Sequence, residues 1–169
     1  MAAVDPERTS VVDPEELRAL LARQPSGVSV VTVDAGEQKL GLTVGSLVSL
    51  SLEPPLIGIS IGLDSARHEP LRDAGRFAVS ILAGGQEALA QHFARSGIPP
   101  VALWRGIPLR ENGHPEPLID GAVAWLGCAT RAEHWAGDHT IFVGEVEWID
   151  LGTDGAALVY YRGEYQSVG

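Results

Sequence analysis

The chain has 169 residues, 45% hydrophobic and 20% charged, with a formal net charge of −10. This composition is typical of a globular domain, and the length favours one domain that buries most of its unfolded surface. The negative charge argues against nucleic acid as a partner, because phosphate backbones would be repelled. No apolar run reaches the roughly 20 residues of a membrane helix, and the single cysteine, Cys128, rules out an internal disulfide.

The first twelve residues predict a flexible tail, since they include charged residues and lack the hydrophobic segment of a signal peptide. We therefore expect a cytoplasmic protein with one domain over residues 13–169. The segment Asp13-Pro14-Glu15-Glu16 is a strong helix start, with Asp as N-cap and Pro in the first turn. Apolar spacing then predicts a short amphipathic helix to about Arg23, with one face formed by Leu17, Leu20 and Leu21.

The stretch from Gly41 to Ile61 predicts two consecutive strands with unusual faces. In the first, small residues alternate with apolar ones, as Thr43, Gly45, Ser49 and Ser51 against Val44, Val48, Leu50 and Leu52. Glu53-Pro54-Pro55 supplies a turn, and the second strand sets three isoleucines against Gly58, Ser60 and Gly62. A low floor of hydroxyls and exposed backbone suits a flat, phosphate-bearing ligand. The alternative from periodicity alone is a half-buried strand with its polar side in water.

The other expected elements are also mostly strands. Besides the two strands above, strands are predicted at 28–33, 76–82, 122–135, 140–149 and 156–161, and helices at 67–73 and 86–95. Residues 104–109 are a candidate for one more strand, and a short segment at 164–168 closes the chain. Seven or eight strands against three helices favour a mainly β protein, an antiparallel sheet closed into a barrel with helices outside. A doubly wound nucleotide-binding fold is not expected, because strands and helices do not alternate regularly and GxGxxG is absent.

Two loops carry further candidate chemistry. Ser65 precedes a predicted helix, so its hydroxyl and Arg67 could hold an anion; the alternative is a plain N-cap with a solvated arginine. Gly137-Asp138-His139 lies between the two longest strands, where His139 is either functional or part of a hairpin corner. The histidines show no recognised metal spacing, and His134 and His139 with Glu133 form a weak candidate, so we predict no metal site.

Four segments together resemble the flavin reductase family, small NAD(P)H:flavin oxidoreductases that serve two-component monooxygenases. They are GLTVGSLVSLSLEPPL, SARHEPLRDAGRFAVSIL, the helix ending in QHFARSG, and AGDHTIFVGEV with the closing YYRGEY. The resemblance covers residues 17–166. It implies an FMN-binding split β-barrel, antiparallel and Greek-key-like with a few flanking helices, and a homodimer that holds FMN or FAD near the subunit interface.

The resemblance also assigns site residues. The segment around the flavin ring and ribityl chain maps to Thr43, Val44, Gly45 and Ser46, the phosphate or adenosine side to Ser60, Ile61, Gly62, Ser65, Ala66 and Arg67, and a bordering segment to Phe93 and Ala94. His139 is the catalytic candidate, beside the docked nicotinamide. The sequence departs from the family pattern at Gly45, where Ser or Asn is frequent, and at His68, where Thr is frequent, so one flavin and one phosphate contact could be lost.

The resemblance implies NAD(P)H-dependent reduction of FMN or FAD by hydride transfer, which supplies reduced flavin to a partner monooxygenase. One alternative is a flavin-binding electron carrier or storage module without nicotinamide turnover. A third is a split-barrel enzyme with another cofactor, such as haem or a deazaflavin. Use of NADPH would need a cation for its extra phosphate, for which Arg131, Arg95 and Arg72 are candidates.

Overall fold

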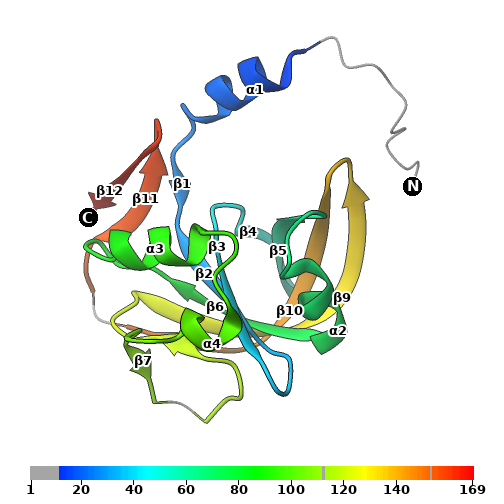
Figure 1. Ribbon diagram of the computed structural model, residues 1–169, viewed down its shortest axis with the longest axis vertical. Helices are drawn as coiled ribbons and strands as arrows, with labels where there is room; N and C mark the ends of the chain where they lie inside the picture. The colour runs from blue at the N-terminus through cyan, green and yellow to red at the C-terminus, as the bar shows by residue number, and fades with distance from the viewer. Residues whose placement is uncertain (1–11, 112, 153) are drawn as a thin grey trace.

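The computed structural model describes residues 12–111, 113–152 and 154–169, which form mainly antiparallel strands with four short helices (Figure 1). The tail expected over residues 1–12 thus lies, except for Val12, outside the described residues. The helices are α1 (Pro14–Leu21), α2 (His68–Ala74), α3 (Glu87–Ala94) and α4 (Pro100–Leu103). The strands are β1 (Ser26–Gly27), β2 (Ser29–Asp34), β3 (Lys39–Val44), β4 (Val48–Leu52), β5 (Pro55–Gly62), β6 (Arg76–Ile81), β7 (Leu109–Arg110), β8 (Leu118–Ile119), β9 (Ala124–Ala136), β10 (His139–Leu151), β11 (Ala157–Tyr161) and β12 (Glu164–Val168).

Seven strands form one antiparallel sheet in the order β3-β2-β6-β9-β10-β5-β4. Its two edge strands, β3 and β4, are joined by only residues 45–47, a link that spans no more than about 14 Å from Val44 to Val48. The sheet must therefore curl until its opposite edges approach each other. The edges are not hydrogen-bonded neighbours, so the prediction of a closed barrel is wrong for this sheet.

The predicted strand from Gly41 onward is two strands. Its first part completes β3, which pairs with β2, and its second part is β4, which pairs with β5. The bend at residues 45–47 breaks the alternation: Val44 is buried, whereas Val48 and Leu50 are each 49% exposed. The turn after β4 and the inward isoleucines of β5 are confirmed, since Ile59 and Ile61 are buried.

Two small sheets complete the strand structure. One has the order β1-β11-β12, and the other pairs β7 with β8. The strand predicted at 104–109 is wrong, because Pro99-Pro100 starts the α4 turn, whose C-cap is Trp104. The Trp104 ring packs on Phe93 with centroids 5.1 Å apart, so tertiary packing decides this segment.

Strand β2 lies at the centre of the core, with both faces buried. Val31 and Val33 face a cluster that contains Phe77 and Phe142, while Val28 and Val30 face a second cluster with Leu82, Phe93 and Leu158. Helix α3 contributes Phe93 to the second cluster, and α2 contributes Leu71 to the first. Each of these helices is thus anchored beside the ends of β3 and β5.

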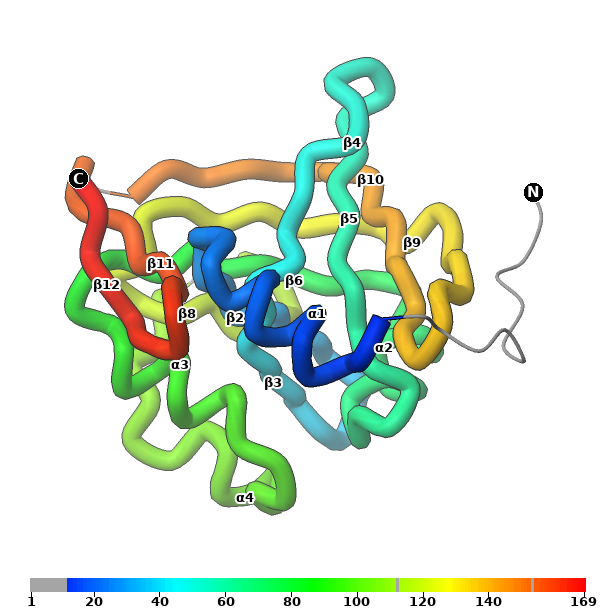
Figure 2. The backbone as a smooth tube through the Cα atoms, turned by 90° about the horizontal axis from the view of Figure 1, so that it is seen from above, coloured from blue at the N-terminus to red at the C-terminus, as the bar shows by residue number. Residues whose placement is uncertain are grey.

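Helix α1 projects away from the sheets (Figure 1), so in the view from above it lies in front of the rest of the chain (Figure 2). Its predicted start is confirmed: the Asp13 carboxylate accepts from the backbone N–H groups of Glu15 and Glu16, at 2.8 and 3.2 Å. None of its residues is buried, so its leucine face is not packed against the described part of this chain. No helix within the described residues is long and apolar enough to cross a membrane.

Candidate functional site

Two adjoining surface cavities bring together the twelve predicted cofactor-binding residues and His139. The larger, of about 470 Å³, is lined by Ser26, Leu42, Thr43, Val44, Gly45, Ser46, Ser60, Ile61, Gly62, Ser65 and His139. The smaller, of about 280 Å³, is lined by Leu42, Thr43, Asp64, Ser65, Ala66, Arg67, Phe93, Ala94, Ser96 and Gly97. Because they share Leu42, Thr43 and Ser65, they form one continuous depression whose size suits an organic cofactor.

The depression lies where the curled sheet fails to close. The end of β3 and residues 45–46 form one wall, and the last residues of β5 form the other. His139 enters the same place because it opens β10 directly opposite Gly62 in the ladder. The seam between the two sheet edges therefore creates the site.

Two glycines keep the floor of the depression low. A Cβ at Gly62 would lie 2.8 Å from Asp64 Oδ1 and 3.8 Å from His139 Nε2. A Cβ at Gly45 would lie 2.9 Å from Ser26 Oγ. A side chain at either position would displace a residue that lines the depression, Ser26 or Asp64, so glycine is needed to keep these neighbours where they are.

Several predicted ligand hydroxyls instead hold the protein's own backbone. Thr43 Oγ1 donates to the carbonyl oxygen of Ala90 in α3 at 2.7 Å. Ser46 Oγ accepts from Ser60 N at 2.9 Å and donates to the Ser60 carbonyl oxygen at 3.2 Å. These contacts position α3 and β5 around the cavity, so Thr43 and Ser46 first of all shape the site.

The anion site expected at Ser65 has a different local geometry. The N-cap of α2 is Arg67, not Ser65, and Ser65 Oγ accepts from Arg67 N at 3.3 Å. Arg67 Nη2 donates to the carbonyl oxygen of Arg95 at 3.3 Å, which draws its guanidinium toward the loop after α3. Its side chain still lines the smaller cavity and supplies a positive charge there.

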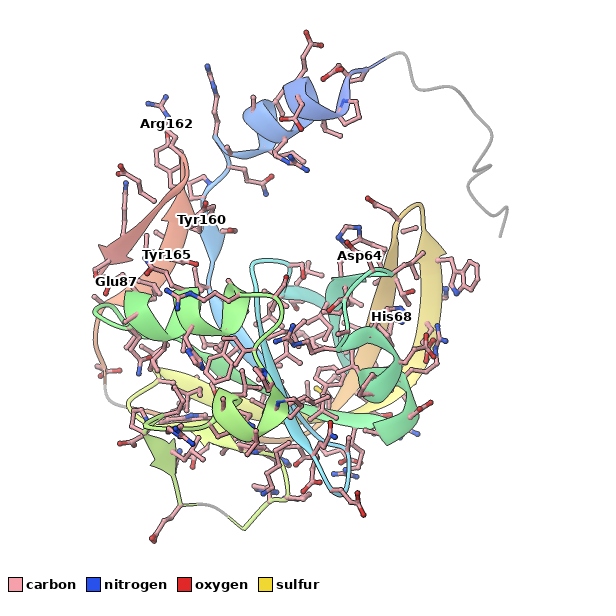
Figure 3. All side chains as sticks on the ribbon, viewed as in Figure 1. Asp64, His68, Glu87, Tyr160, Arg162 and Tyr165 are labelled. Atoms are coloured by element: carbon pink, nitrogen blue, oxygen red, sulfur yellow. The ribbon has the colours of Figure 1, made fainter. Side chains whose placement is uncertain are left out.

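His139 is held by the hairpin turn in which it lies. Its Nδ1 is 2.7 Å from Asp138 Oδ1, and Asp138's carbonyl oxygen accepts from Leu63 N at 2.9 Å. The hydrogen bond from His139, followed by its charge, lowers the pKa of Asp138. An ionised carboxylate only accepts, so we assign a proton to His139 Nδ1. The other ring nitrogen, Nε2, lies on the Gly62 side, 3.8 Å from the position of a Cβ built on Gly62. Asp64, in the loop after β5, lies on the same side, with Oδ1 2.8 Å from that position (Figure 3).

His68, a departure from the family pattern, lies beneath the site and not in it. It is 2% exposed on α2, with Nε2 2.8 Å from Thr140 Oγ1 and Nδ1 3.1 Å from Glu69 Oε1 (Figure 3). Its ring also meets Phe142 edge-on, with centroids 5.4 Å apart. His68 therefore ties α2 to β10 one residue after His139.

The arginines considered for a nicotinamide phosphate are mostly engaged elsewhere. Arg72 donates to Glu133 at 2.9 Å, a hydrogen bond that raises the pKa of Arg72, and Arg131 is ion-paired with Glu145. None of Arg72, Arg95 and Arg131 lines either site cavity.

Sequence reasoning missed five lining residues: Ser26, Leu42, Asp64, Ser96 and Gly97. Ser26 comes from β1, whose placement depends on its pairing with β11, more than 130 positions later in the chain. No local pattern could have revealed that contact. Leu42 and Asp64 were adjacent to predicted residues, and that adjacency was the available signal.

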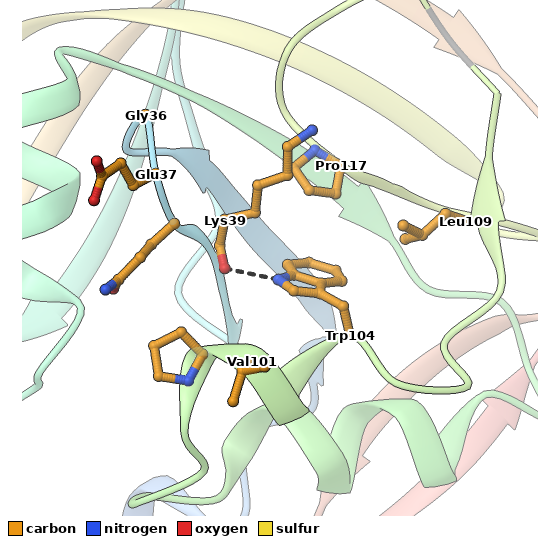
Figure 4. A pocket seen from close by; sticks show the side chains of 9 residues that line it. Gly36, Glu37, Lys39, Val101, Trp104, Leu109 and Pro117 are labelled. Atoms are coloured by element: carbon orange, nitrogen blue, oxygen red, sulfur yellow. Dashed lines mark hydrogen bonds between the residues drawn. The ribbon is translucent and has the colours of Figure 1, made fainter.

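A cavity of about 710 Å³, larger than either of these two, lies elsewhere, between the β2–β3 hairpin and α4 (Figure 4). It is lined by Trp104, Val101, Leu109, Pro100, Pro117 and residues 36–39. Two of its polar groups bond within the protein: Trp104 Nε1 donates to the Lys39 carbonyl oxygen at 2.7 Å, and Lys39 Nζ donates to that of Pro115 at 3.1 Å. It contains none of the predicted site residues.

No three His, Cys, Asp or Glu side chains within the described ranges gather closely enough to hold a metal ion. The weak metal candidate combined His134 with His139 and Glu133. Glu133 bonds to Arg72 and His139 bonds to Asp138, so both of these side chains have other partners.

The chain is similar in sequence to known flavin reductases. The chain is 38% identical to an NADH-dependent flavin reductase from Rhodococcus sp. over 98% of this chain and 90% of the relative. It is 41% identical to the reductase component of 4-hydroxyphenylacetate 3-monooxygenase from Thermus thermophilus, over 90% of this chain and 95% of the relative.

A solved bacterial structure has a similar fold. BorF, the flavin reductase component of a two-component tryptophan halogenase, superposes with a TM-score of 0.86 and 35% identity, covering 92% of this chain and 98% of BorF. Residues 21–169 match the model of the flavin reductase like domain. The chain therefore belongs to the flavin reductase family.

Proposed function

We propose that this chain is an NADH-dependent flavin reductase that reduces FMN or FAD in the depression between β3 and β5. The observation that carries the proposal is the convergence of four separate segments, those around Thr43, Gly62, Phe93 and His139, on the two adjoining cavities. When bound, the nicotinamide supplies a hydride and the flavin accepts it. The relatives are named for NADH, FMN and FAD, and both site cavities are free of the arginines Arg72 and Arg131 that NADPH could have used.

The chain's own residues bind and orient the two ligands. Gly45 and Gly62 allow close approach of a flat ring, and Arg67 supplies a positive charge for the flavin phosphate. His139 lines the larger cavity, with Nδ1 held by Asp138. Its Nε2 would hydrogen-bond either the nicotinamide carboxamide or the flavin ring as negative charge develops on it. Correct placement of the two rings is the main catalytic contribution of such a site.

The direct test mixes the purified protein with NADH and either FMN or FAD and follows the loss of absorbance by the reduced nicotinamide. Turnover supports the reductase function, and the ratio of the kcat/KM values for FMN and FAD gives its flavin preference. Tight flavin binding without NADH oxidation would instead indicate an electron carrier or storage module. Failure to bind either flavin would exclude both functions and leave another cofactor, such as haem or a deazaflavin.

We also propose that the reductase supplies reduced flavin to a separate monooxygenase in the cytoplasm, as the names of two relatives suggest for those proteins. The fold uses no internal disulfide, since Cys128 is the single cysteine of the chain and is buried, and a cytoplasmic protein needs none. The test is to add a flavin-dependent monooxygenase with its substrate: product should form only when the reductase, NADH and flavin are all present, and its absence in the complete mixture would contradict this role.

We further propose a homodimer of split β-barrels, each formed by a single domain over residues 13–169. Edge strand β4 supports it, because Val48, Leu50 and Leu52 are 49%, 49% and 90% exposed. An exposed apolar edge favours association. Sedimentation velocity should show a dimer that Leu50→Lys weakens, while Val101→Lys on the distant helix α4 leaves it intact. A monomeric wild-type protein would refute the dimer.

A further inference from the structure

One hydroxyl of the larger cavity is not used by the fold. Ser26 lines this cavity from β1 and is partly buried. Unlike Thr43 and Ser46, its hydroxyl has no hydrogen-bond partner among the described residues. A half-buried hydroxyl without a protein partner, directed at a cavity, is available to a ligand.

The position of Ser26 explains why residue 45 is glycine. A Cβ built on Gly45 would lie 2.9 Å from Ser26 Oγ and 3.5 Å from Ser26 Cβ. The hydroxyl of β1 therefore occupies the space that a side chain at position 45 would enter. Because Ser26 is itself held by the ladder, opposite Tyr160 of β11, this hydroxyl is positioned by backbone pairing.

The two cavities indicate which part of a ligand Ser26 would meet. Ser26 and Gly45 line only the larger cavity, whereas Arg67 and Ser96 line only the smaller one. A phosphate held near Arg67 leaves the ring of the same molecule to extend toward Ser26. The polar edge of a flavin ring carries two amide-type carbonyls, and a serine O–H is a suitable donor to such an oxygen.

We propose that Ser26 is a flavin-binding residue whose hydroxyl donates a hydrogen bond to a carbonyl at the polar edge of the ring, and that Gly45 leaves room for this contact. It rests on the proposed flavin reductase function. The nicotinamide carboxamide offers the same carbonyl chemistry. The flavin is the favoured partner of Ser26, because Ser26 lies on β1, whereas His139, the proposed nicotinamide contact, lies on β10 and is held by Asp138.

Three variants test the contact: Ser26→Ala, Gly45→Ala and the double variant. Ser26→Ala should raise the Kd for FMN or FAD, measured by quenching of flavin fluorescence, about two- to tenfold, the loss expected for one neutral hydrogen bond. Gly45→Ala should have a similar effect, because its methyl group displaces the hydroxyl at 2.9 Å. The double variant should resemble each single one, since both remove the same contact. The KM for NADH and the thermal midpoint should not change.

Ser49→Ala is the matched control, an exposed serine on neighbouring β4 that lines neither cavity. An unchanged flavin Kd in Ser26→Ala, or additive effects in the double variant, would overturn the proposal. A raised KM for NADH with an unchanged flavin Kd would assign Ser26 to the carboxamide and likewise overturn it. A wild-type protein that binds flavin but does not oxidise NADH would refute the reductase function alone, since the Kd comparison needs no turnover.

Discussion

Ser46 Oγ and the backbone of Ser60 form a reciprocal pair, with the hydroxyl accepting from Ser60 N at 2.9 Å and facing the Ser60 carbonyl oxygen at 3.2 Å. The bond joins the segment after β3 to β5, so it bridges the two sides of the seam. It holds the site open at a defined width without closing the sheet. A residue predicted as a flavin contact thus has a structural contact that the sequence did not reveal.

Ser46→Ala should lower the free energy of unfolding by about 1–2 kcal/mol, because the Ser60 N–H loses its partner. Urea unfolding measures this change. Ser49→Ala, at an exposed position of β4, should change stability by less than about 0.5 kcal/mol. Equal stability of Ser46→Ala and wild type would show that the bridge contributes nothing to the fold.

His139→Ala should lower kcat/KM for NADH roughly tenfold to a hundredfold, corresponding to about 1.5–3 kcal/mol for a charge-assisted hydrogen bond. Steady-state kinetics with saturating flavin measures the effect. His134→Ala on β9 is the control, since this exposed histidine lines neither cavity. Wild-type kinetics in His139→Ala would remove His139 from the mechanism.

Thr140→Val should destabilise the fold by about 1–3 kcal/mol, because buried His68 Nε2 loses its 2.8 Å partner. Thr130→Val makes the same chemical change on β9, where Oγ1 is buried without a hydrogen-bond partner among the described residues. That substitution should be neutral or slightly stabilising. Thermal melts compare the pair, and equal losses would show that the His68 contact is not the cause.

Gly41→Ala should destabilise the fold by about 1–3 kcal/mol, because its Cβ would lie 2.7 Å from Cε1 of the buried Phe93 ring. Moving Phe93 would also shift α3, and if flavin binds at the smaller cavity as proposed, its affinity should fall. Gly27→Ala is the control, with nothing within 4 Å of the added atom. Denaturant unfolding and flavin titration measure the two effects, and a Gly41→Ala protein as stable as Gly27→Ala would contradict the packing.

Cys128 should make the fold sensitive to alkaline pH. Burial, followed by the charge of Glu147, raises the pKa of this thiol to about 12, whereas an unfolded cysteine titrates near 8.5. Above about pH 8.5 the unfolded state loses a proton that the folded state keeps. The free energy of unfolding therefore falls as pH rises, by up to about 1.4 kcal/mol per pH unit.

Urea unfolding at pH 8 and pH 10 measures this dependence. Cys128→Ala should lose less stability than wild type over that interval, whatever its stability at pH 8. The folded wild-type thiol should also resist iodoacetamide at pH 8 and react only in denaturant. Identical pH dependence in the two proteins would contradict the raised pKa.

Local sequence patterns determined most of the elements. The cap at Asp13 and the left-handed Gly75 after α2 place helix ends by chemistry within a few residues, and the strands near the C-terminus follow from alternation. The family resemblance pointed to residues that the structure brings together around two adjoining cavities, although their role as flavin contacts stays a prediction. Helix caps and strand alternation depend on residues that are close together in the chain, so they can be predicted from a single sequence.

Tertiary structure decided how these elements meet. The bend after Val44 sends β3 and β4 to opposite edges of the sheet, which no alternation of residues can show because both parts are regular strands. Ser26 reaches the site only through pairing with β11, and His68 becomes a buried link to Thr140 only when α2 packs on β10. Contacts between distant segments arise from the closing of the fold around its core, so the seam and its free hydroxyl belong to the three-dimensional structure.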